Sequence, residues 1–507
     1  MGSPLITRQD PPRRYVLPVT PKVAWSARPG KRRENLSRLA LLAVLGLQAV
    51  LTLRLGNSAS PEEATLLLNG AARLDGTDAS GLPVVLGAPF LYPFLAAFAE
   101  QSFGLEGARA LSLLAVLAAN ALLYATTRQL FGVRPALLGA GVFAVAAPTA
   151  FLGNIATYDA FSLLLLVAAV WATVRFSRSA VLSVALAGLF GVLAFAVKFG
   201  SGIFLPAVVG VAFAVVIPRV GAGRAAARAA GLLLVILIGS GFLVVAGGLS
   251  DALGTALSGG ADAGEAGAGT ILYDATAYGG LYVLTALFGC FSFWRTAAMS
   301  EIPGAEVRGP RKGARLLISL SMTLPAVVLT LYQSVVGTDE GSLIRHVGIG
   351  LALATPMAGL GMSRMLGAHF ASPQYPILVW IILFTFGYGQ ALSAMTAWPQ
   401  TDNLIAFLRT EVKAEGKYLA PEPQTIVYGL GRDATDPAQW TDVGELADAQ
   451  AVRKGEYDLI VLDTEAAPEI NEPVEKEMVD GGRYRLRARF DHSYDDSGDY
   501  EIWVKYR

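Results

Sequence analysis

Residues 180–197, AVLSVALAGLFGVLAFAV, form an unbroken run of 18 residues without a charged side chain. At about 1.5 Å per residue, a helix of this length crosses most of the ~30 Å hydrocarbon core of a bilayer. Runs of this kind recur along the chain, in which 53% of the 507 residues are hydrophobic and 16% are charged. Soluble domains contain about 25% charged residues. The sequence therefore predicts an all-α polytopic membrane protein.

The apolar runs predict about eleven transmembrane helices. The first run follows a basic, Pro-rich leader and has no small-residue cleavage site close behind it, which is typical of a retained span and not of a cleaved signal peptide. An odd number of spans puts the two termini on opposite sides of the membrane. The expected spans cover residues 37–55, 108–127, 135–153, 158–175, 180–197, 200–217, 227–247, 278–296, 314–336, 344–363 and 374–396.

The positions of Lys and Arg predict the orientation, because cytoplasmic loops are enriched in both residues. With a cytoplasmic N-terminus, every inner segment carries basic residues, among them Arg13, Arg14, Lys31, Arg32, Arg33, Arg128, Arg134, Arg175, Arg178, Arg219, Arg224, Arg228, Arg308, Arg311, Lys312, Arg315 and Arg364. The outer segments carry fewer, namely Arg54, Arg73, Arg109, Lys198 and Arg345. We therefore expect a multi-pass protein of the cell (plasma) membrane with an extracytoplasmic C-terminus.

The composition of the chain changes to that of a soluble domain after Trp398. Residues 401–417 show helical spacing of apolar side chains, whereas TIVYGL (425–430), YDLIVLD (457–463) and YEIWVKYR (500–507) are typical of strands. The expected organisation is a cytoplasmic, disordered basic leader, a transmembrane domain and a small extracytoplasmic α/β domain, over residues 1–36, 37–398 and 399–507.

The composition also excludes some kinds of site. A single cysteine, Cys290, rules out an intrachain disulfide framework and a cysteine metal cluster. Only three histidines are present (His346, His369 and His492), which argues against a His-rich zinc site. The net charge of zero gives no indication of a nucleic-acid partner, and none is expected.

The segment SPEE, residues 60–63, follows the first span and contains two adjacent acids. Ser60, Pro61 and Glu63 fit a capping box with proline at the first helical position. A carboxylate in this place could also act as a general base for an incoming hydroxyl or amine, or help to hold a metal. The two interpretations are compatible, because a capped helix holds its acids rigidly.

Asp159 lies at the outer start of the fourth expected span, in the segment NIATYDAF (154–161). An acid at the bilayer centre costs about 2.5–3.5 kcal/mol, so Asp159 is expected at the interface or facing a polar cavity. Ionisable residues in such places are candidates for function. The alternative is an ordinary first-turn acid of a helix capped by Thr157.

The basic residues of the outer segments run against the orientation bias. Lys198 lies in a tight turn between two apolar runs, and Arg345 and His346 open the tenth expected span. A cation at the outer interface is well placed to bind a lipid phosphate. Arg109, at the start of the second span, is a candidate for the same role. Arg54 and Arg73 are equally well explained as anchors that extend toward the interface.

Acids and cations at one interface suit the transfer of a group from a lipid-linked phosphate donor to an acceptor, because the cations hold the leaving phosphate and an acid activates the nucleophile. The sequence contains no phosphate-binding Gly-X-X-X-X-Gly-Lys loop, so nucleotide-driven transport has no support. Whether Glu62 and Asp159 hold a divalent metal stays open, because two acids do not define a ligand set.

The order of these features resembles the GT-C superfamily of integral-membrane glycosyltransferases, in particular the group with dolichyl-phosphate-mannose protein mannosyltransferases and bacterial aminoarabinose transferases. The similar segments lie within residues 37–400, and their order and spacing carry the specificity. They are SPEEATLLLNGAARL, GAPFLYPFLAAF, GARALSLLAVLAANALLYATTRQLFG, ATYDAFSLLLLVAAVW, AVKFGSGIFLP and SLIRHVGIGLALATPMAG.

The resemblance implies a glycosyltransferase, hexosyl or pentosyl, that uses a polyprenyl-phosphate-linked sugar at the outer face, usually with inversion at the sugar carbon. The family's first outer loop usually reads Asp-Glu, with the Asp as catalytic acid or base. Glu62 stands at that position, which keeps the carboxylate and lengthens its arm by one methylene, and Glu63 matches the second acid. Asp159 and Lys198 match an acid and a basic residue of the family.

The sequence thus predicts Glu62, Asp159 and Glu63 as catalytic residues. The expected residues for the donor phosphate are Lys198, Arg345, His346 and Arg109. The expected partners are membrane lipids, the donor, and a lipid, glycan or protein acceptor. Two other functions remain as alternatives: a transporter or flippase of lipid-linked sugars, and a family member without catalysis. A transporter would favour internal repeats and broken helices at the midplane, and the sequence has no clear repeat.

Overall fold

The structure is a computed structural model of the chain. It describes residues 31–76, 91–250, 253, 267–295, 312–336, 340–367, 370–443, 449–464, 468–492 and 499–506. Most of the expected leader, residues 1–30, lies outside the described part.

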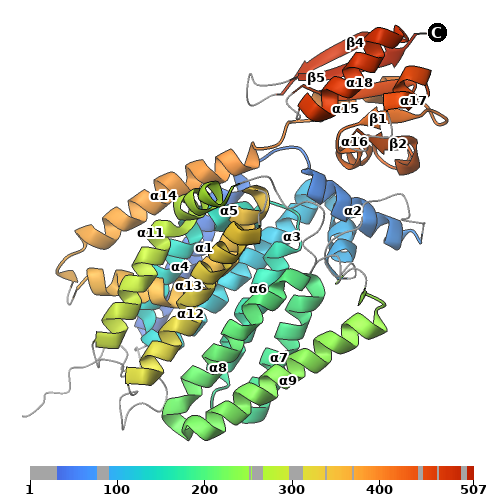
Figure 1. The fold of residues 1–507 in the computed structure, drawn as a ribbon. Helices are drawn as coiled ribbons and strands as arrows, with labels where there is room; N and C mark the ends of the chain where they lie inside the picture. The colour runs from blue at the N-terminus through green and yellow to red at the C-terminus, as the bar shows by residue number, and fades with distance from the viewer. Residues whose placement is uncertain are drawn as a thin grey trace, which may run out of the picture.

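Long helices run side by side and form the body of the molecule (Figure 1). All eleven expected spans fall on them. Among the described residues, eight helices are long and apolar enough to cross a membrane, and the pair α4–α5, bent by 68°, makes a ninth. The other two expected spans are α6 and α12. The elements of this body are α1 (Lys31–Leu53), α3 (Leu91–Phe131), α4 (Val133–Val145), α5 (Ala147–Gly153), α6 (Asp159–Arg175), α7 (Ala180–Val197), η1 (Phe199–Phe204), α8 (Leu205–Val220), α9 (Ala222–Ala246), α11 (Ala268–Arg295), α12 (Lys312–Val336), α13 (Glu340–Met365) and α14 (Gln374–Met395).

Helix α13 is the central helix of the bundle, because its span is the most buried of the candidate spans. It packs against α11 through glycines. A Cβ atom on Gly289 of α11 would collide with the carbonyl of Met357, and one on Gly361 of α13 would collide with that of Thr285. Small residues let helices approach closely in a membrane, where packing replaces the hydrophobic drive between helices. This close packing holds the C-terminal half of α13 against α11.

Helix α3 is two helices joined at Gly104, which has φ 69° and ψ −166°. The first part follows α2 (Pro61–Leu74) and contacts it. It exposes Phe94 and Phe98 and buries Tyr92 and Ala96, so it has one apolar outer face and one packed face. This pattern fits a helix that lies along the membrane interface. The break at Gly104 lets the chain turn from this direction into the membrane span.

The C-terminal domain contains a five-stranded mixed sheet in the order β2-β1-β3-β5-β4. Strands β1, β2 and β3 are parallel, and β5 pairs antiparallel with both β3 and β4. Buried apolar side chains from both sheet faces pack on the helices. The elements are α15 (Asp402–Glu411), β1 (Tyr418–Ala420), α16 (Pro423–Leu430), η3 (Pro437–Gln439), β2 (Trp440–Asp442), α17 (Ala449–Lys454), β3 (Leu459–Asp463), α18 (Pro468–Gly481), β4 (Tyr484–Asp491) and β5 (Asp499–Lys505).

Two of the three expected strands are present, as β3 and β5, and the third prediction is wrong. The segment TIVYGL, residues 425–430, lies in helix α16 and not in a strand. Pro423 stands in the first helical turn, and Gly431 ends the helix with a φ of 88°. These two residues define a short helix. The β-branched residues Ile426 and Val427 are buried by it, so packing overrides their strand propensity.

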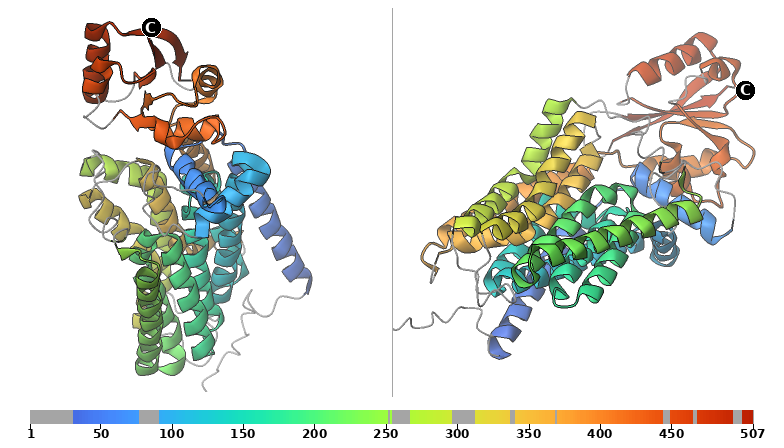
Figure 2. Two further views of the ribbon diagram at one scale, coloured as in Figure 1. Left: turned by 90° about the vertical axis from the view of Figure 1, so that its right-hand side faces the viewer. Right: turned by 60° about the horizontal axis from the view of Figure 1, so that its bottom comes forward.

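The C-terminal domain lies at the end of the bundle where α2 is found (Figures 1 and 2). Helix α16 packs against α2, and Leu68 of α2 belongs to the domain's apolar core. The domain is therefore seated on the helix that follows the first span.

Candidate active site

The loop after α1 leads into α2, whose first turn carries the two adjacent acids. Ser60 is the N-cap: its hydroxyl accepts from the backbone N–H of Glu63, and its own N–H donates to the Glu63 carboxylate at 3.0 Å. This is the expected capping box. Because Glu63 is tied to the cap, its side chain points back into the protein, and Glu62 next to it points in a different direction.

Glu63 is fully buried and hydrogen-bonded on both carboxylate oxygens. Arg109 of α3 donates to Oε1 through Nε at 2.9 Å and to Oε2 through Nη2 at 2.8 Å. The backbone N–H of Ala156, in the loop before α6, donates to Oε1 at 2.6 Å. Glu63 thus joins α2, α3 and the α5–α6 loop, and its charge is matched by one buried guanidinium.

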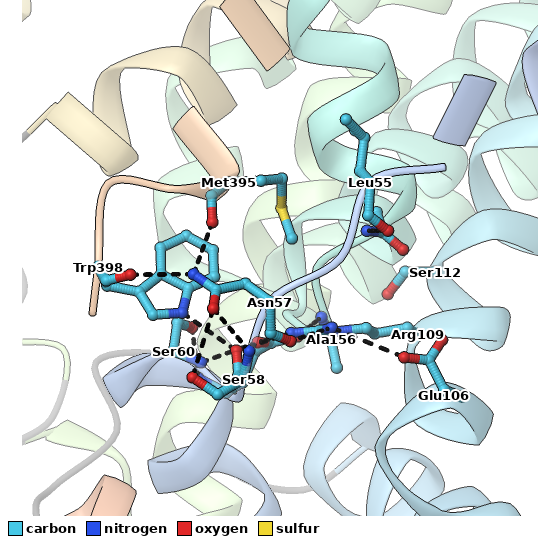
Figure 3. A network of polar contacts seen from close by, with 12 residues as sticks. Leu55, Asn57, Ser58, Ser60, Glu106, Arg109, Ser112, Ala156, Met395 and Trp398 are labelled. Atoms are coloured by element: carbon cyan, nitrogen blue, oxygen red, sulfur yellow. Dashed lines mark hydrogen bonds and ion pairs between the residues drawn. The ribbon is translucent and has the colours of Figure 1, made fainter. Parts of the chain in front are cut away.

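Arg109 also holds the backbone of the loop before α2. Its Nη1 donates to the carbonyl of Asn57 at 2.8 Å, and Nη2 donates to that of Ser58 at 3.1 Å (Figure 3). Each of its three side-chain nitrogens therefore has an acceptor, and the side chain is almost fully buried. The roles predicted from sequence, donor-phosphate binding for Arg109 and catalysis for Glu63, stay predictions. Both residues have the contacts of a buried structural pair.

Asp159 lies at the first position of α6 and is fully buried. It accepts hydrogen bonds from two side chains and forms an ion pair with a third. Lys198 Nζ donates to Oδ1 at 2.5 Å, Thr157 Oγ1 donates to Oδ2 at 3.2 Å, and Arg345 Nη1 lies 3.7 Å from Oδ2. Lys198 is the C-cap of α7, just before η1, and its ammonium also lies 5.1 Å from the ring centroid of Tyr158. Asp159 therefore holds two cations, which come from different helices.

Glu62 accepts from Arg345, which lies near the N-terminal end of α13. The side chain of Glu62 is 32% exposed, and Tyr158 lies close to it. Glu62, Arg345, Asp159 and Lys198 thus form a continuous chain of alternating charge, from a partly exposed carboxylate to a buried ammonium. Two acids and two cations balance in charge, which reduces the cost of their burial.

His346 lies beside this chain and not within it. Its Nδ1 is 3.2 Å from the hydroxyl of Ser342, one turn earlier on α13, and it is close enough to Lys198 and Asp159 to be affected by both charges. The structure thus brings together four of the seven predicted residues, and places His346 next to them. Glu63 and Arg109 form the separate pair behind α2.

No pattern in the sequence singled out Tyr158, whose ring lies against the Lys198 ammonium and which is close to Glu62. Nor did any pattern single out Asn57, Ser58 and Trp398, which hold the loop before α2 (Figure 3). Aromatic and small polar residues are common near membrane interfaces, so their type gives no specific signal. Tyr158 stands next to Asp159 in the sequence, and that adjacency is the one indication the sequence contained.

The residues of the site do not fit a divalent metal. Within the described part of the chain there is no group of three or more His, Cys, Asp or Glu side chains that could hold one. Both Glu62 and Asp159 already contact Arg345, whose positive charge lies between them. A metal ion there would face that guanidinium at close range, which is electrostatically unfavourable.

The comparisons with known proteins agree with this architecture. Residues 87–244 match the family model described as dolichyl-phosphate-mannose-protein mannosyltransferase, a range that includes Asp159 and Lys198 but not Glu62 or Arg345. A search of curated proteins gave no significant match.

Solved structures match over nearly the whole chain. ArnT from Cupriavidus metallidurans bound to undecaprenyl phosphate is 13% identical, with a TM-score of 0.55 over 92% of this chain and 97% of that one. The apo form of ArnT gives 12% identity and 0.58, over 93% and 98%. Archaeal oligosaccharyltransferase AglB from Archaeoglobus fulgidus, in complex with an inhibitory peptide and a dolichol-phosphate, gives 10% and 0.56, over 93% and 74%. The chain therefore has the fold of ArnT and AglB, which is the fold that its resemblance to the GT-C superfamily predicted.

Proposed function

We propose that this protein is a membrane glycosyltransferase that moves a sugar from a polyprenyl-phosphate donor to an acceptor at the outer face of the membrane. The observation that carries the proposal is the charge chain of Glu62, Arg345, Asp159 and Lys198. It combines one partly exposed carboxylate with two cations at the same end of the bundle. The solved relatives ArnT and AglB, which bind undecaprenyl phosphate and a dolichol-phosphate, support a lipid-linked donor.

Glu62 is the general base in this proposal. Of the three predicted catalytic acids it is the one whose carboxylate is partly exposed, since Glu63 and Asp159 are fully buried. A base must reach the proton that it abstracts, so exposure to the site favours Glu62. Asp159 then acts by holding Lys198 and Arg345 in place, and the Glu63–Arg109 pair holds the loop that presents Glu62.

Lys198 and Arg345 bind the phosphate of the donor, with His346 beside them. In the reaction, the acceptor hydroxyl or amine attacks the anomeric carbon, its proton passes to Glu62, and the bond from that carbon to the phosphate oxygen breaks. The polyprenyl phosphate leaves with the electron pair of that bond, and the two cations stabilise the negative charge that develops. Attack from the face opposite the leaving group inverts the sugar carbon.

Arg345 also links donor binding to the base. Its Nη1 contacts Glu62 and lies 3.7 Å from Asp159. The donor phosphodiester competes with Glu62 for this guanidinium, because it also presents one negative charge on two free oxygens, which a guanidinium can bind at two points. Binding of the donor therefore frees the Glu62 carboxylate to accept a proton. The base becomes active when the leaving group is in place.

The site and the C-terminal domain lie at the same end of the bundle, which supports a common outer side (Figure 1). We infer that the chain spans the cell membrane with its N-terminus in the cytoplasm and with residues 399–507 outside. The acceptor belongs to the lipids, glycans or proteins that reach this face, and the sugar is a hexose or pentose.

Purified protein reconstituted with labelled polyprenyl-phosphate sugars tests the proposal. Glu62→Gln keeps the size of the side chain and removes the base, so transfer is expected to fall by about 10²–10⁴-fold. Glu106→Gln is a matched control, because Glu106 is 76% exposed and lies on α3, three residues before Arg109. Full transfer by Glu62→Gln would refute the role of Glu62. No transfer by the wild type from any polyprenyl-phosphate sugar would refute the proposed function.

One observation favours a lipid flippase as a second candidate. The pair α4–α5 is bent by 68° at Ala146, and broken helices are common at transporter sites. The charged residues lie at one end of the bundle and not at this break. The same reconstituted vesicles separate the two functions: a flippase changes the side on which the labelled lipid is found and leaves the sugar–phosphate bond intact.

A further inference from the structure

The linker between α14 and the C-terminal domain is hydrogen-bonded to the loop that leads into α2. Asn57 contributes both donors of its amide: Nδ2 donates to the carbonyl of Met395 at 2.8 Å and to that of Trp398 at 2.9 Å. Its Oδ1 accepts from the backbone N–H of Ser58 at 2.7 Å. Asn57 is therefore bonded to two residues of the linker, which are 338 and 341 positions away from it in the sequence.

Trp398 and Ser58 add further bonds between the same two segments. The indole N–H of Trp398 donates to the carbonyl of Ser58 at 3.0 Å, and the Ser58 hydroxyl donates to the carbonyl of Pro399 at 3.3 Å. The backbone N–H of Thr401, next to the start of α15, donates to the same hydroxyl at 3.2 Å. Figure 3 shows the Asn57 amide and the Trp398 indole on one side of the loop, with the Arg109 guanidinium on the other. The loop is held from both sides.

The domain also contacts α2 farther along the helix. Leu68 of α2 is buried in the apolar core of the domain, together with Ile405 and Val427. At the end of α2, Asp75 accepts from Arg432, which follows α16, at 2.7 Å. The linker thus holds the beginning of α2, and α16 holds its middle and its end.

Glu62 lies between these attachment points, in the first turn of α2 and four residues after Ser58. It faces Arg345, which belongs to the bundle. The distance between the Glu62 carboxylate and the Arg345 guanidinium therefore depends on the position of α2. The hydrogen bonds from the linker fix the N-terminal end of α2, which is the end that carries Glu62. None of the bonds that Asn57 and Trp398 make with the other segment touches Glu62 itself.

We propose that the C-terminal domain is a clamp for α2, and that Asn57 and Trp398 are positioning residues that set the Glu62 carboxylate against Arg345. The kinetic part of this inference rests on the proposed glycosyl transfer. The structural part does not, because the order of α2 can be measured without a substrate.

Three variants isolate the hydrogen bonds from the rest of the domain. Trp398→Phe removes the single indole donor and keeps the aromatic ring. Asn57→Ala removes every hydrogen bond of the amide. Asn57→Asp keeps the acceptor for Ser58 but turns a carboxylate oxygen toward the carbonyls of Met395 and Trp398. Gln400→Ala is the control, because Gln400 lies in the same linker and donates to Asp402 of the domain.

Hydrogen exchange of the whole protein in detergent, followed by mass spectrometry, measures the order of α2. In Asn57→Ala and Asn57→Asp, peptides that cover residues 59–66 are expected to exchange about 10-fold faster or more, since loss of linking bonds favours local opening. Peptides from α13 are expected to keep the wild-type rate. Asn57→Asp should be at least as affected as Asn57→Ala; a wild-type rate in Asn57→Asp would mean that only the local bond to Ser58 matters, and would overturn the clamp.

Transfer kinetics measure the position of Glu62. The kcat of Asn57→Ala and Trp398→Phe is expected to fall by about 10–100-fold, as for a catalytic group that is displaced by about 1 Å, while the KM for the lipid-linked donor stays near that of the wild type. Gln400→Ala should match the wild type in both assays. Unchanged exchange in all three variants overturns the clamp, whatever the kinetics. If the wild type transfers no sugar, the proposed function fails, and the exchange experiment still decides the clamp.

Discussion

The guanidinium of Arg345 binds the carboxylate of Glu62 across 283 residues of sequence, and the same Nη1 lies 3.7 Å from Asp159. Arg345 is therefore shared between a partly exposed acid and a fully buried one. In this position Arg345 can stay paired with the buried Asp159 while its contact with the exposed Glu62 is replaced by a contact with the donor phosphate. The proposed mechanism depends on this division of roles between two carboxylates.

Replacement of Arg345 tests its role toward the donor phosphate. Arg345→Lys keeps one charge but loses the planar fork that can contact two acceptors at once. We expect kcat/KM for the lipid-linked donor to fall about 10-fold in Arg345→Lys and about 10²–10³-fold in Arg345→Ala. Steady-state kinetics on reconstituted protein measure both. A wild-type kcat/KM in Arg345→Ala would contradict its binding of the phosphate.

The Asp159–Lys198 pair predicts an effect on stability that is separate from activity. Asp159→Asn leaves the buried ammonium of Lys198 without its carboxylate, which is expected to destabilise the protein by about 3–5 kcal/mol. The double variant Asp159→Asn with Lys198→Met removes both charges and should recover much of that loss. Thermal unfolding in detergent measures the stability of the wild type, the single variant and the double variant.

Activity should not follow stability in that series. The double variant lacks one of the two cations proposed for the phosphate, so its transfer rate is expected to stay low even where its unfolding temperature is restored. Recovery of transfer together with stability would assign Lys198 a structural role only.

The buried pair of Glu63 and Arg109 predicts loss of stability without loss of donor affinity. Arg109→Ala leaves the Glu63 carboxylate buried and frees two backbone carbonyls, so the unfolding free energy should fall by about 3–5 kcal/mol. The KM for the donor, measured well below the unfolding temperature, is expected to stay near that of the wild type. A large rise in this KM would instead support the expectation from sequence that Arg109 binds the phosphate. Glu106→Gln serves as the exposed control.

Glu422, in the C-terminal domain, predicts a dependence of stability on pH. Local desolvation and the nearby carboxylates of Asp442 and Asp463 raise the pKa of Glu422 to about 7. A raised pKa means that the folded state binds more protons than the unfolded state between pH 4.5 and about 7, so this residue makes the domain less stable as the pH rises through that range.

Glu422→Gln should therefore stabilise the domain at pH 8, by about 1 kcal/mol after solvent screening, and should have no effect near pH 4.5. Thermal unfolding of the full chain, followed by tryptophan fluorescence at both pH values, measures the difference. Glu415→Gln is the control, because Glu415, like Glu422, is an exposed glutamate of the same domain. A stabilisation that is equal at both pH values would contradict the titration of Glu422.

Much of the membrane part could be predicted from local sequence. The run at residues 180–197 coincides with α7, and each other expected span falls on a helix. The reason is that lipid offers no partner for backbone N–H and C=O groups, so a long apolar segment has the helix as its local solution. The capping box at Ser60 was also predictable, because all its partners lie within four residues of sequence.

The roles of neighbouring residues could not be predicted in this way. Glu62 and Glu63 are identical in type and adjacent, yet one is partly exposed beside Arg345 and the other is buried against Arg109. In the C-terminal domain, packing of Ile426 and Val427 made a helix from a segment with strand propensity. Both outcomes depend on partners far away in the chain.

The apolar runs alone thus determined the helical membrane body, because the solvent around them acts on each segment separately. Only the tertiary structure decided which acid faces the site, which cations gather around Asp159, and that the linker at Trp398 holds the loop before α2. These pairings join segments up to 343 residues apart, and they form because helix packing and the seating of the C-terminal domain bring the segments together.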